Sequence, residues 1–377
     1  MKQTHIAGLI TITLAACSWL SSPVWAQQQL SEPQLTQMLT VLEEIFADQQ
    51  MVGMQGAIFD GEQVHSLNLG YADLEHQVPV TDQTRFEIAS ITKVFTGLAI
   101  LMLEESGDLD LDAPVQRYVP DFPRKPEGEV TARQLAGMMA GIRHYQNERD
   151  EVFYATHYDS VIQALDVFKD DELIAEPGTA SNYSSYSFNL LAAVIERASG
   201  RDFTETISDR LLSPMGLQNT GFTDIRIPLP HRSRHYSFID LYDREVLPTL
   251  QILPTRNHSY NMGGGNMYST AEDLVNFGRQ LLTPGLLSDN VVSQVFATHV
   301  LPTGQPGDFS DGWIMMGQQA SPPFLMAGGS YPGTLSLLLV FPDQAVVAAM
   351  LSNTWGKDGP NVMDQLIMNW SIAPLVP

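Results

Sequence analysis

The sequence predicts a mixed α/β (α+β) fold, in which one sheet is built from both ends of the chain around an inserted, mostly helical region. Strand-like runs occur near both ends, at 54–59, 63–69, 312–316, 333–341 and 345–352. Helical patterns dominate in between, from about residue 130 to 210. Strands from the two ends bury their apolar faces most readily in one shared sheet, with the helices beside it.

Composition narrows the class of protein. The chain has 377 residues, of which 44% are hydrophobic and 17% charged, so it has enough apolar material for a large core. Its formal net charge of −23 disfavours partners that carry phosphate, because Asp and Glu repel them. We therefore expect no nucleic-acid partner.

The amino terminus is predicted to be a signal peptide over residues 1–26. Lys2 supplies a positive start, and Val24-Trp25-Ala26 places small residues at the cleavage positions after a largely apolar run. The mature domain, 27–377, would then be periplasmic or secreted. Leu14-Ala15-Ala16-Cys17 fits a second interpretation, a lipoprotein box that would leave the protein lipid-anchored through Cys17. No later segment is apolar for the roughly 18 residues that a span needs, so no integral membrane span is expected after processing.

The amino-terminal part of the mature chain is predicted to form a helix, a hairpin and a buried helix. Ser31-Glu32-Pro33 indicates the start of the first helix, because a capping residue is followed by an early proline. Asp60-Gly61, between two strand-like runs, predicts the hairpin. The second helix, predicted from Ser90 to about Gly107, is apolar on most sides and should be buried.

Several helices and a second hairpin are predicted farther along. The helices are expected at 131–139, 160–168, 187–199 and 269–282, the hairpin at 233–250, and a closing helix from Asp358. His231, Arg232, Arg234 and His235 lie at the hairpin's start, where we expect solvated faces rather than an anion or metal site. The glycines 263–265 do not fit a phosphate loop and are expected to let the backbone pass close to another element.

Ser90 and Lys93 form the motif with the clearest chemistry. They stand three residues apart at a helix start, so their side chains project from one face. Desolvation and the helix dipole both disfavour a buried ammonium there, so Lys93 could accept the serine proton. The chain has only five lysines, at 2, 93, 125, 169 and 357, and no other serine has one three residues on. The alternative is an ordinary helix start, with Ser90 as the cap and Lys93 in solvent.

Further motifs follow one another along nearly all of the mature chain. They are Gly70 to Asp73, Phe86 to Lys93, Leu109 to Val115, Pro177 to Ser185, Asn189 to Gly200, Pro214 to Phe222 and the glycines before Tyr268. Together they resemble the serine β-lactamase-like superfamily, which includes class C β-lactamases, D-alanyl-D-alanine carboxypeptidases and esterases. Val115 to Pro123 and Gly141 to Tyr145 are similar to the subgroup of the mitochondrial serine β-lactamase-like protein and its bacterial relatives.

The resemblance implies a β-lactamase/transpeptidase-like fold, with an antiparallel sheet flanked by helices and a mostly helical inserted region. The sheet region would cover about 27–85 and 258–377, and the helical region about 86–257. The active site would lie in the cleft between the two regions.

The resemblance also implies roles for individual residues. Ser90 would be the acylated nucleophile, and Lys93 the proton acceptor beside it. Tyr183 would share the role of the base and pass a proton to the leaving group, while Ser185 would point into the same cleft. The family's strand motif falls on Met326-Ala327-Gly328-Gly329. There Gly328 and Gly329 would contact the substrate, and the amides of Gly329 and Ser90 would form the oxyanion hole.

Two departures from the family pattern bear on the substrate. Met326 and Ala327 stand where relatives have a basic residue and a threonine, which help to hold a substrate carboxylate. Met138 and Met139 replace polar residues and are expected to line a lipophilic pocket.

We therefore expect a secreted serine hydrolase that acts through an acyl-enzyme on ester or amide substrates, with esters favoured over β-lactams and D-Ala peptides. The alternative is a catalytically weakened member that binds a ligand or serves as a scaffold. The substrate should be a small molecule or a short peptide. The scattered histidines indicate neither a metal nor another cofactor, and the oligomeric state stays open.

Overall fold

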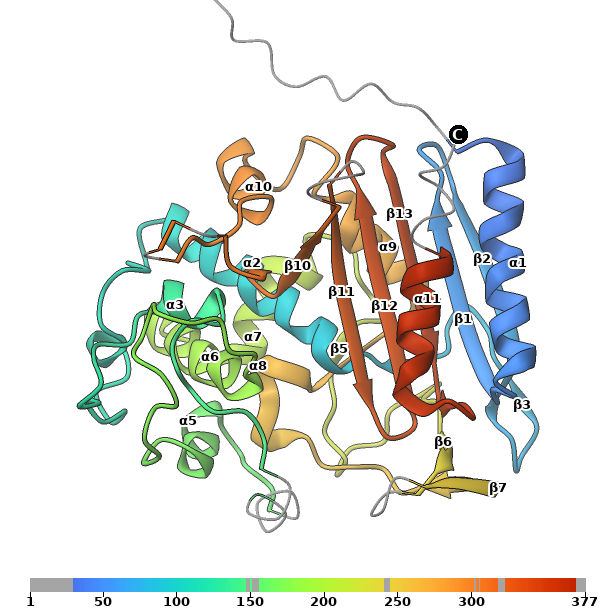
Figure 1. Cartoon of the computed structure of the whole chain (residues 1–377), viewed down its shortest axis with the longest axis horizontal. Helices are drawn as coiled ribbons and strands as arrows, with labels where there is room; N and C mark the ends of the chain where they lie inside the picture. Colours follow the sequence, from blue (N-terminus) through green and yellow to red (C-terminus); the bar gives the residue numbers. More distant parts are fainter. Residues whose placement is uncertain are drawn as a thin grey trace, which may run out of the picture.

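The computed structural model describes residues 30–146, 150, 156–240, 245–301, 303–304, 306–317 and 323–370. The predicted signal peptide, 1–26, and the alternative lipid anchor at Cys17 lie outside these residues. The described part is organised around an eight-stranded sheet with the order β3-β2-β1-β13-β12-β11-β10-β9 (Figure 1). Every neighbouring pair in this sheet is antiparallel.

The strands of the central sheet come from both ends of the chain, and so do the helices that cover it. The strands are β1 (Gly53–Phe59), β2 (Val64–Asp73), β3 (Val78–Pro79), β9 (Phe309–Ser310), β10 (Trp313–Met316), β11 (Phe324–Tyr331), β12 (Thr334–Phe341) and β13 (Val346–Ser352). The covering helices are α1 (Glu32–Asp48), α9 (Ala271–Arg279) and α11 (Val362–Trp370). β1 lies directly beside β13, with Ala57 opposite Ala349, so the predicted antiparallel fold is confirmed.

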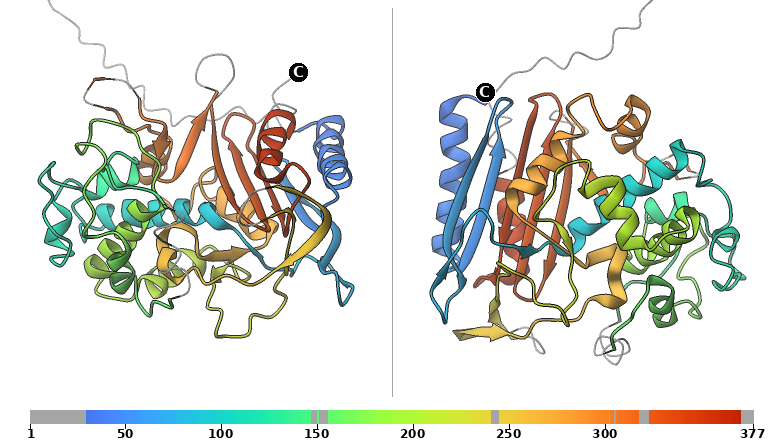
Figure 2. Two further views of the ribbon diagram at one scale, coloured as in Figure 1. Left: turned by 60° about the horizontal axis from the view of Figure 1, so that its bottom comes forward. Right: turned by 180° about the vertical axis from the view of Figure 1, so that it is seen from behind.

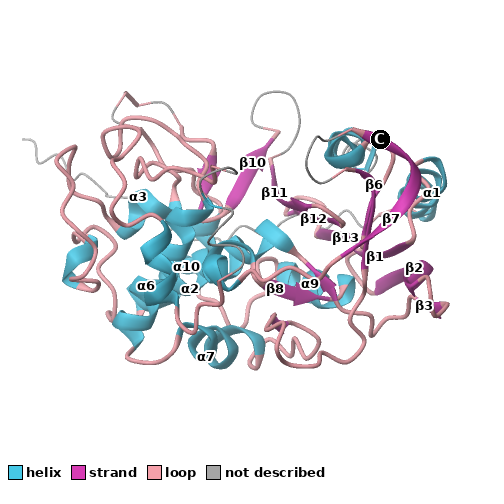
Figure 3. Cartoon of the chain, turned by 90° about the horizontal axis from the view of Figure 1, so that it is seen from below, coloured by secondary structure: helices cyan, strands magenta, loops and turns pink. Residues whose placement is uncertain are grey.

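The helical region lies beside this sheet (Figure 3). Its helices are η1 (Ala89–Ile91), α2 (Thr92–Glu105), η2 (Val115–Arg117), α3 (Ala132–Ala136), α5 (Val161–Ala164), η3 (Leu165–Val167), α6 (Ser185–Ser199), α7 (Phe203–Ile207), η4 (Ser208–Leu212), η5 (Ser259–Asn261) and α8 (Met262–Gly265), with α10 (Asp289–Val295) and η6 (Gly359–Asn361) outside it. The remaining strands form two small sheets. One consists of β4 (Phe86–Glu87), β8 (Met267–Ser269) and β5 (Gly221–Phe222). The other consists of β14 (Thr354–Trp355), β6 (His235–Ile239) and β7 (Val246–Leu253).

Both faces of the central sheet are covered, which explains why its inner strands are almost wholly apolar. Leu337 and Leu339 of β12 face one core together with α1 and α11, which lie in front of the sheet in Figure 1. Leu338 and Val340 face the other core, which includes α9 on the back of the sheet and the helical region (Figure 2, right). Alternate residues of one strand therefore hold two layers together.

Three predicted helices are shorter or divided in the structure, and the one predicted at 269–282 is α9, which ends at Arg279. The segment predicted at 131–139 forms only α3, which starts at the cap Thr131 and ends before Gly137. The segment predicted at 160–168 is divided into α5 and the 3-10 turn η3. The predicted hairpin at 233–250 is present as the antiparallel pair of β6 and β7, and its turn around Asp243-Arg244 lies outside the described residues. Within the described ranges, no helix is long and apolar enough to cross a membrane.

Candidate active site

Ser90 lies at a sharp turn between a strand and the buried helix α2. β4 ends at Glu87, and Ala89, the first residue of η1, adopts a left-handed backbone conformation with φ of 44°. A non-glycine residue rarely takes this conformation, so the surrounding packing must hold it in place. The turn leaves Ser90 half-buried just before the amino-terminal end of α2, where it lines a pocket.

Lys93, one helical turn later, lies beneath Ser90 and is only 1% exposed. Its Nζ donates to Ser90 Oγ (3.1 Å), to Ser185 Oγ (3.0 Å) and to the carbonyl of Gly264 (2.6 Å). These three acceptors match the three donors of an ammonium. The alternative of a solvated lysine at an ordinary helix start is therefore wrong.

The glycine segment of α8 makes the contact with Lys93 possible, and its close approach to another element was predicted from the sequence. A Cβ on Gly263 would overlap the carbonyl of Phe188 in α6, and one on Gly264 would overlap the side chain of Asn261. Without side chains, α8 packs closely against α6 and brings the Gly264 carbonyl to the ammonium. Glycine is needed here for close approach rather than for phosphate binding.

Tyr183 reaches Ser90 from the residues just before α6. Ser184 is the cap of this helix, because its Oγ accepts a hydrogen bond from the amide of Ser187 and donates to the carbonyl of Arg143. The fixed cap directs the preceding phenol into the site, where the Tyr183 hydroxyl lies 2.7 Å from Ser90 Oγ. Lys93 Nζ lies 5.0 Å from the centre of the Tyr183 ring.

Burial and their mutual attraction shift the pKa values of Lys93 and Tyr183. Burial lowers the pKa of Lys93 below its ordinary value, while Tyr183 partly opposes this effect. Burial alone would raise the pKa of Tyr183, but the charge of Lys93 and hydrogen bonds from the site lower it instead. Both pKa values are lowered and the two groups interact directly, so the phenol and the amine can share one proton.

Gly329 brings the backbone of β11 against the backbone of Ser90. A Cβ at this position would overlap the carbonyl of Ile88 and the hydroxyl of Ser336, and would lie 2.9 Å from the Ser90 nitrogen. Ser336 on β12 ties the two segments together by donating to the Ile88 carbonyl (2.8 Å) and to the Gly329 carbonyl (3.2 Å). Glycine is the residue that fits between them.

Gly329→Ala should separate β11 from the nucleophile. We expect kcat/KM for an ester substrate to fall about 100-fold, because a displacement near 1 Å costs that much in catalysis. The free energy of unfolding should fall by about 1–3 kcal/mol through overpacking. Gly328→Ala is the matched control, since its Cβ would meet its nearest atom, Met363 Sδ, at an ordinary 3.7 Å. Equal losses in both variants would contradict the role of Gly329.

Five of the site residues predicted from the sequence line one pocket of about 600 Å³. These are Ser90, Tyr183, Ser185, Gly328 and Gly329. Met138 and Met139, expected to line a lipophilic pocket, do not line it: Met138 has a φ of 57° and is buried in the core of the helical region. That expectation is wrong, and the apolar wall is instead formed by side chains of β10, β11 and α11, namely Ile314, Met326, Met363 and Ile367.

His144 is a site residue to which the sequence assigned no role. Its ring lies edge-on to Tyr183 with the centroids 5.1 Å apart, and its Nδ1 accepts a hydrogen bond from the Ser185 amide (3.2 Å). Burial, reinforced by the charge of Lys93, lowers the pKa of His144 to about 4. At neutral pH it therefore adds no second positive charge beside the Lys93–Tyr183 pair. Only its place in the Gly141 to Tyr145 motif could have indicated it.

A buried charged cluster adjoins the pocket and corrects a second expectation. Arg232 forms an ion pair with the buried Glu87, and the Nε2 atoms of His235 and His258 lie 4.0 and 3.9 Å from Glu87 Oε2. His235 is 4% exposed and His258 is 6% exposed. The expected solvated faces around 231–235 are therefore wrong at Arg232 and His235, because β6 packs between β7 and β14.

His258 should make the protein less stable in acid. Burial lowers its pKa from the ordinary 6.5 to about 4, against the attraction of Glu87. Between pH 7 and 5 the unfolded histidine binds a proton and the folded one does not, so the free energy of unfolding should fall by about 2 kcal/mol from this residue. Urea unfolding at both pH values measures the fall. In His258→Asn the difference between the two pH values should shrink by that amount, and an unchanged difference would contradict this assignment.

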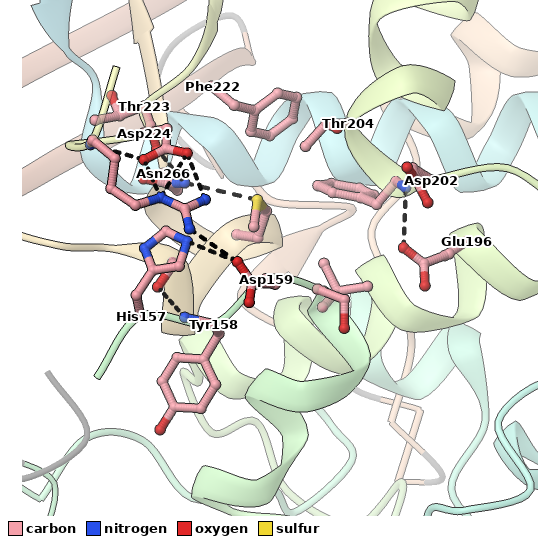
Figure 4. A pocket seen from close by; sticks show the side chains of 16 residues that line it. His157, Tyr158, Asp159, Glu196, Asp202, Thr204, Phe222, Thr223, Asp224 and Asn266 are labelled. Carbon is pink, nitrogen blue, oxygen red and sulfur yellow. Dashed lines mark hydrogen bonds and ion pairs between the residues drawn. The ribbon is translucent and has the colours of Figure 1, made fainter. Parts of the chain in front are cut away.

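A second cavity, of about 280 Å³, lies in the helical region (Figure 4). Its carboxylates are Asp159, Glu196, Asp202 and Asp224. Arg226 pairs with Asp159 and Asp224, and no serine in its lining has a lysine beside it. Among the residues that the structure describes, no group of three or more His, Cys, Asp or Glu could hold a metal ion. The Ser90 pocket is therefore the candidate active site.

Sequence comparison agrees with the motifs. A profile of the beta-lactamase family matches residues 38–368. The human mitochondrial serine beta-lactamase-like protein LACTB is 30% identical over 293 residues, which cover 60% of this chain and 52% of that protein. Penicillin-binding protein 4* of Bacillus subtilis is 27% identical, covering 83% of this chain and 70% of its own length. The chain thus spans about half the length of the first of these relatives.

Solved structures share the fold. A D-stereospecific amidohydrolase from a Streptomyces species superposes with a TM-score of 0.70 at 26% identity, covering 87% of this chain and 97% of that one. A D-amino acid amidase from Ochrobactrum anthropi superposes with a TM-score of 0.74 at 20% identity, covering 90% and 98% of the two chains. The chain therefore has its overall fold in common with these proteins.

Proposed function

Because the chain belongs to the beta-lactamase family, we propose that it is a serine hydrolase that cleaves ester or amide substrates through an acyl-enzyme on Ser90. One observation carries the proposal: the Ser90 Oγ lies 2.7 Å from the Tyr183 hydroxyl and 3.1 Å from Lys93 Nζ. A serine hydroxyl is a weak nucleophile unless a base at hydrogen-bond distance takes its proton. Here two groups that share a proton are at that distance.

In the acylation step, Tyr183 accepts the proton of Ser90 while Oγ forms a bond to the substrate carbonyl carbon. Lys93 holds the negative charge of the phenolate, because its ammonium lies next to the phenol. The carbonyl electrons move onto oxygen, where the backbone amides of Ser90 and Gly329 stabilise the charge. When the tetrahedral intermediate collapses, the leaving group departs with the proton from Tyr183.

In the deacylation step, water replaces the leaving group. Tyr183 accepts a proton from this water as its oxygen attacks the acyl carbon, and the same backbone amides hold the oxyanion. Collapse releases the acid, and Ser90 Oγ recovers its proton from Tyr183. His144 stays neutral beside Tyr183 and positions Ser185, which in turn accepts a hydrogen bond from Lys93.

We favour esters and small amides over β-lactams and D-Ala peptides as substrates. Met326 is buried and apolar at the position where the family resemblance implies a basic residue, and it lines the pocket with Ile314, Met363 and Ile367. Such a wall favours an apolar substituent near the scissile bond. The names of two structural neighbours, an amidohydrolase and an amidase, are compatible with amides.

We also propose that the enzyme acts outside the cytoplasm. Residues 1–26 have the composition of a signal peptide, and Leu14 to Cys17 supply a lipoprotein box as the alternative.

Labelling tests the proposal directly. The mature protein is incubated with a fluorophosphonate probe, and the adduct is located by mass spectrometry of the digested protein. In parallel, hydrolysis of short-chain nitrophenyl esters and of a chromogenic cephalosporin is measured. We expect the adduct on Ser90 and turnover of the esters above that of the cephalosporin. An unlabelled protein without turnover would contradict the proposal and favour a ligand-binding member of the family.

A further inference from the structure

The second cavity is separate from the Ser90 pocket, because no described residue lines both. The wall between them is formed by α8 and the residues beside it. Met262 and Asn266 face the cavity, whereas Asn261 and Gly265 line the pocket. The hydrolysis proposed above uses the pocket alone. With a volume of about 280 Å³, the cavity has room for a small ligand of its own.

One end of the cavity carries two carboxylates, those of Glu196 and Asp202 (Figure 4). Glu196 accepts a hydrogen bond from the Phe203 amide (3.3 Å), and neither it nor Asp202 forms an ion pair within the described ranges. Burial raises the pKa of Glu196, and the charge of Asp202 adds to the rise. The Phe203 amide and Arg197 offset it only in part. A cation bound between the two carboxylates would relieve their repulsion.

The opposite end of the cavity has buried acceptors that receive no hydrogen bond (Figure 4). Asn266, 2% exposed, donates from Nδ2 to the Thr223 carbonyl (3.0 Å), and its Oδ1 has no donor among the described residues. Thr223, 8% exposed, has no described partner for Oγ1. The carboxylates nearby, Asp159 and Asp224, share the single charge of Arg226. An unpaired buried acceptor destabilises the fold, so these positions favour a ligand that donates hydrogen bonds.

Apolar side chains lie between the two polar ends. Phe222 of β5 is in this position in Figure 4. Its ring meets that of Phe203 with the centroids 5.4 Å apart, and Val161 of α5 and Met262 of α8 complete the lining. A ligand that reaches both ends must therefore have an apolar middle, and aromatic faces also attract an ammonium group.

We propose that the second cavity binds an aliphatic diamine that spans its two ends. One ammonium lies against Glu196 and Asp202, where it supplies the counter-charge. The other donates to the free acceptors of Asn266 and Thr223, because one ammonium has three donors. The methylene chain lies along Phe222 between them. This binding site goes beyond the proposed hydrolysis and does not depend on it.

Calorimetry in an amine-free buffer tests the proposal on the mature protein with three matched probes. Cadaverine has an ammonium at both ends of a five-carbon chain, pentylamine has one, and the pentanediol with terminal hydroxyls has none. We expect cadaverine to bind at least about tenfold more tightly than pentylamine, because a hydrogen bond to a charged group contributes about that factor. The diol should not bind.

Two substitutions assign the two ends of the ligand. Glu196→Gln should weaken both cadaverine and pentylamine at least about fivefold, because both place an ammonium there. Thr223→Val should weaken cadaverine at least about fivefold and pentylamine less than about twofold. Valine keeps the shape of threonine and removes a hydroxyl that has no described partner. The temperature of thermal unfolding should therefore stay the same or rise in Thr223→Val.

Glu205→Gln is the matched control for charge. Glu205 lies on α7 outside the lining of the cavity, so the same change in net charge should leave cadaverine binding unchanged. Failure of cadaverine to bind, equal binding of the diol, or an affinity that survives both Glu196→Gln and Thr223→Val would overturn the proposal. A protein that binds cadaverine but never labels at Ser90 would refute the proposed hydrolase and leave the diamine site standing.

Discussion

Ser90→Ala is expected to lower kcat/KM for nitrophenyl esters by at least about 10⁴-fold, because the variant has no nucleophile while the base and the oxyanion donors remain. The fluorophosphonate adduct should disappear. Stability should change little, since Ser90 is half-buried and alanine fits the same turn; Ala89 beside it already has the strained conformation.

A matched serine controls for the substitution itself. Ser293 is exposed on α10, where its hydroxyl donates to the carbonyl of Asn290, and Ser293→Ala should label and turn over like the parent. If Ser90→Ala kept the adduct or more than a few per cent of the activity, another group would have to be the nucleophile.

Lys93→Met should produce the second largest effect, a fall of about 10³-fold or more in the rate of acylation. The methionine preserves the volume of the buried chain but removes the charge that stabilises the Tyr183 phenolate. Folding should tolerate the change, because a charge no longer has to be buried, although Ser185 and the Gly264 carbonyl lose their donor. Single-turnover labelling measures acylation, and thermal unfolding measures stability.

Lys125→Met is the appropriate control for Lys93. Burial lowers the pKa of Lys125 too, and its Nζ donates to the carbonyls of Lys169 and Asp171. Because it lies outside the Ser90 pocket, its loss should leave acylation unchanged. Equal rates in the two variants would show that Lys93 has no special role.

The pH dependence of acylation should identify the same pair. Both pKa values are below their ordinary values, and the pair is active when Lys93 and Tyr183 together hold one proton. As pH falls the pair binds its second proton, so the acylation rate of the parent enzyme should fall on the acid side. Lys93→Met should shift this limb, whereas a parent profile that is flat from pH 5 to 9 would contradict the shared proton.

The sequence was informative where function depends on local spacing. Ser90 and Lys93 are one helical turn apart, so their meeting follows from helix geometry alone. The nearly continuous apolar runs of β12 and β13 predicted central strands, since a strand covered on both faces has no polar side. Tyr183 and Gly329 could be proposed only through the order of the family motifs, because the fold rather than the sequence brings them to Ser90.

The wrong predictions concern side chains whose direction depends on contacts with residues far away in the sequence. Met138 was expected in a pocket, but its left-handed backbone turns it into the core, where its sulfur accepts a hydrogen bond from the Ser184 amide. His235 was expected in solvent, yet β14 from the other end of the chain pairs with β6 and helps to bury it.

The contact between β11 and the Ser90 turn also determines when reactivity can arise. Ser336 reaches the Ile88 carbonyl across 248 positions of the sequence, so the halves of the catalytic centre meet only after the last strands have joined the first. A chain emerging from the ribosome would carry Ser90 and Lys93 side by side before the oxyanion donors of the proposed site are in place. Reactivity at Ser90 would thus be delayed until the chain is complete and folded.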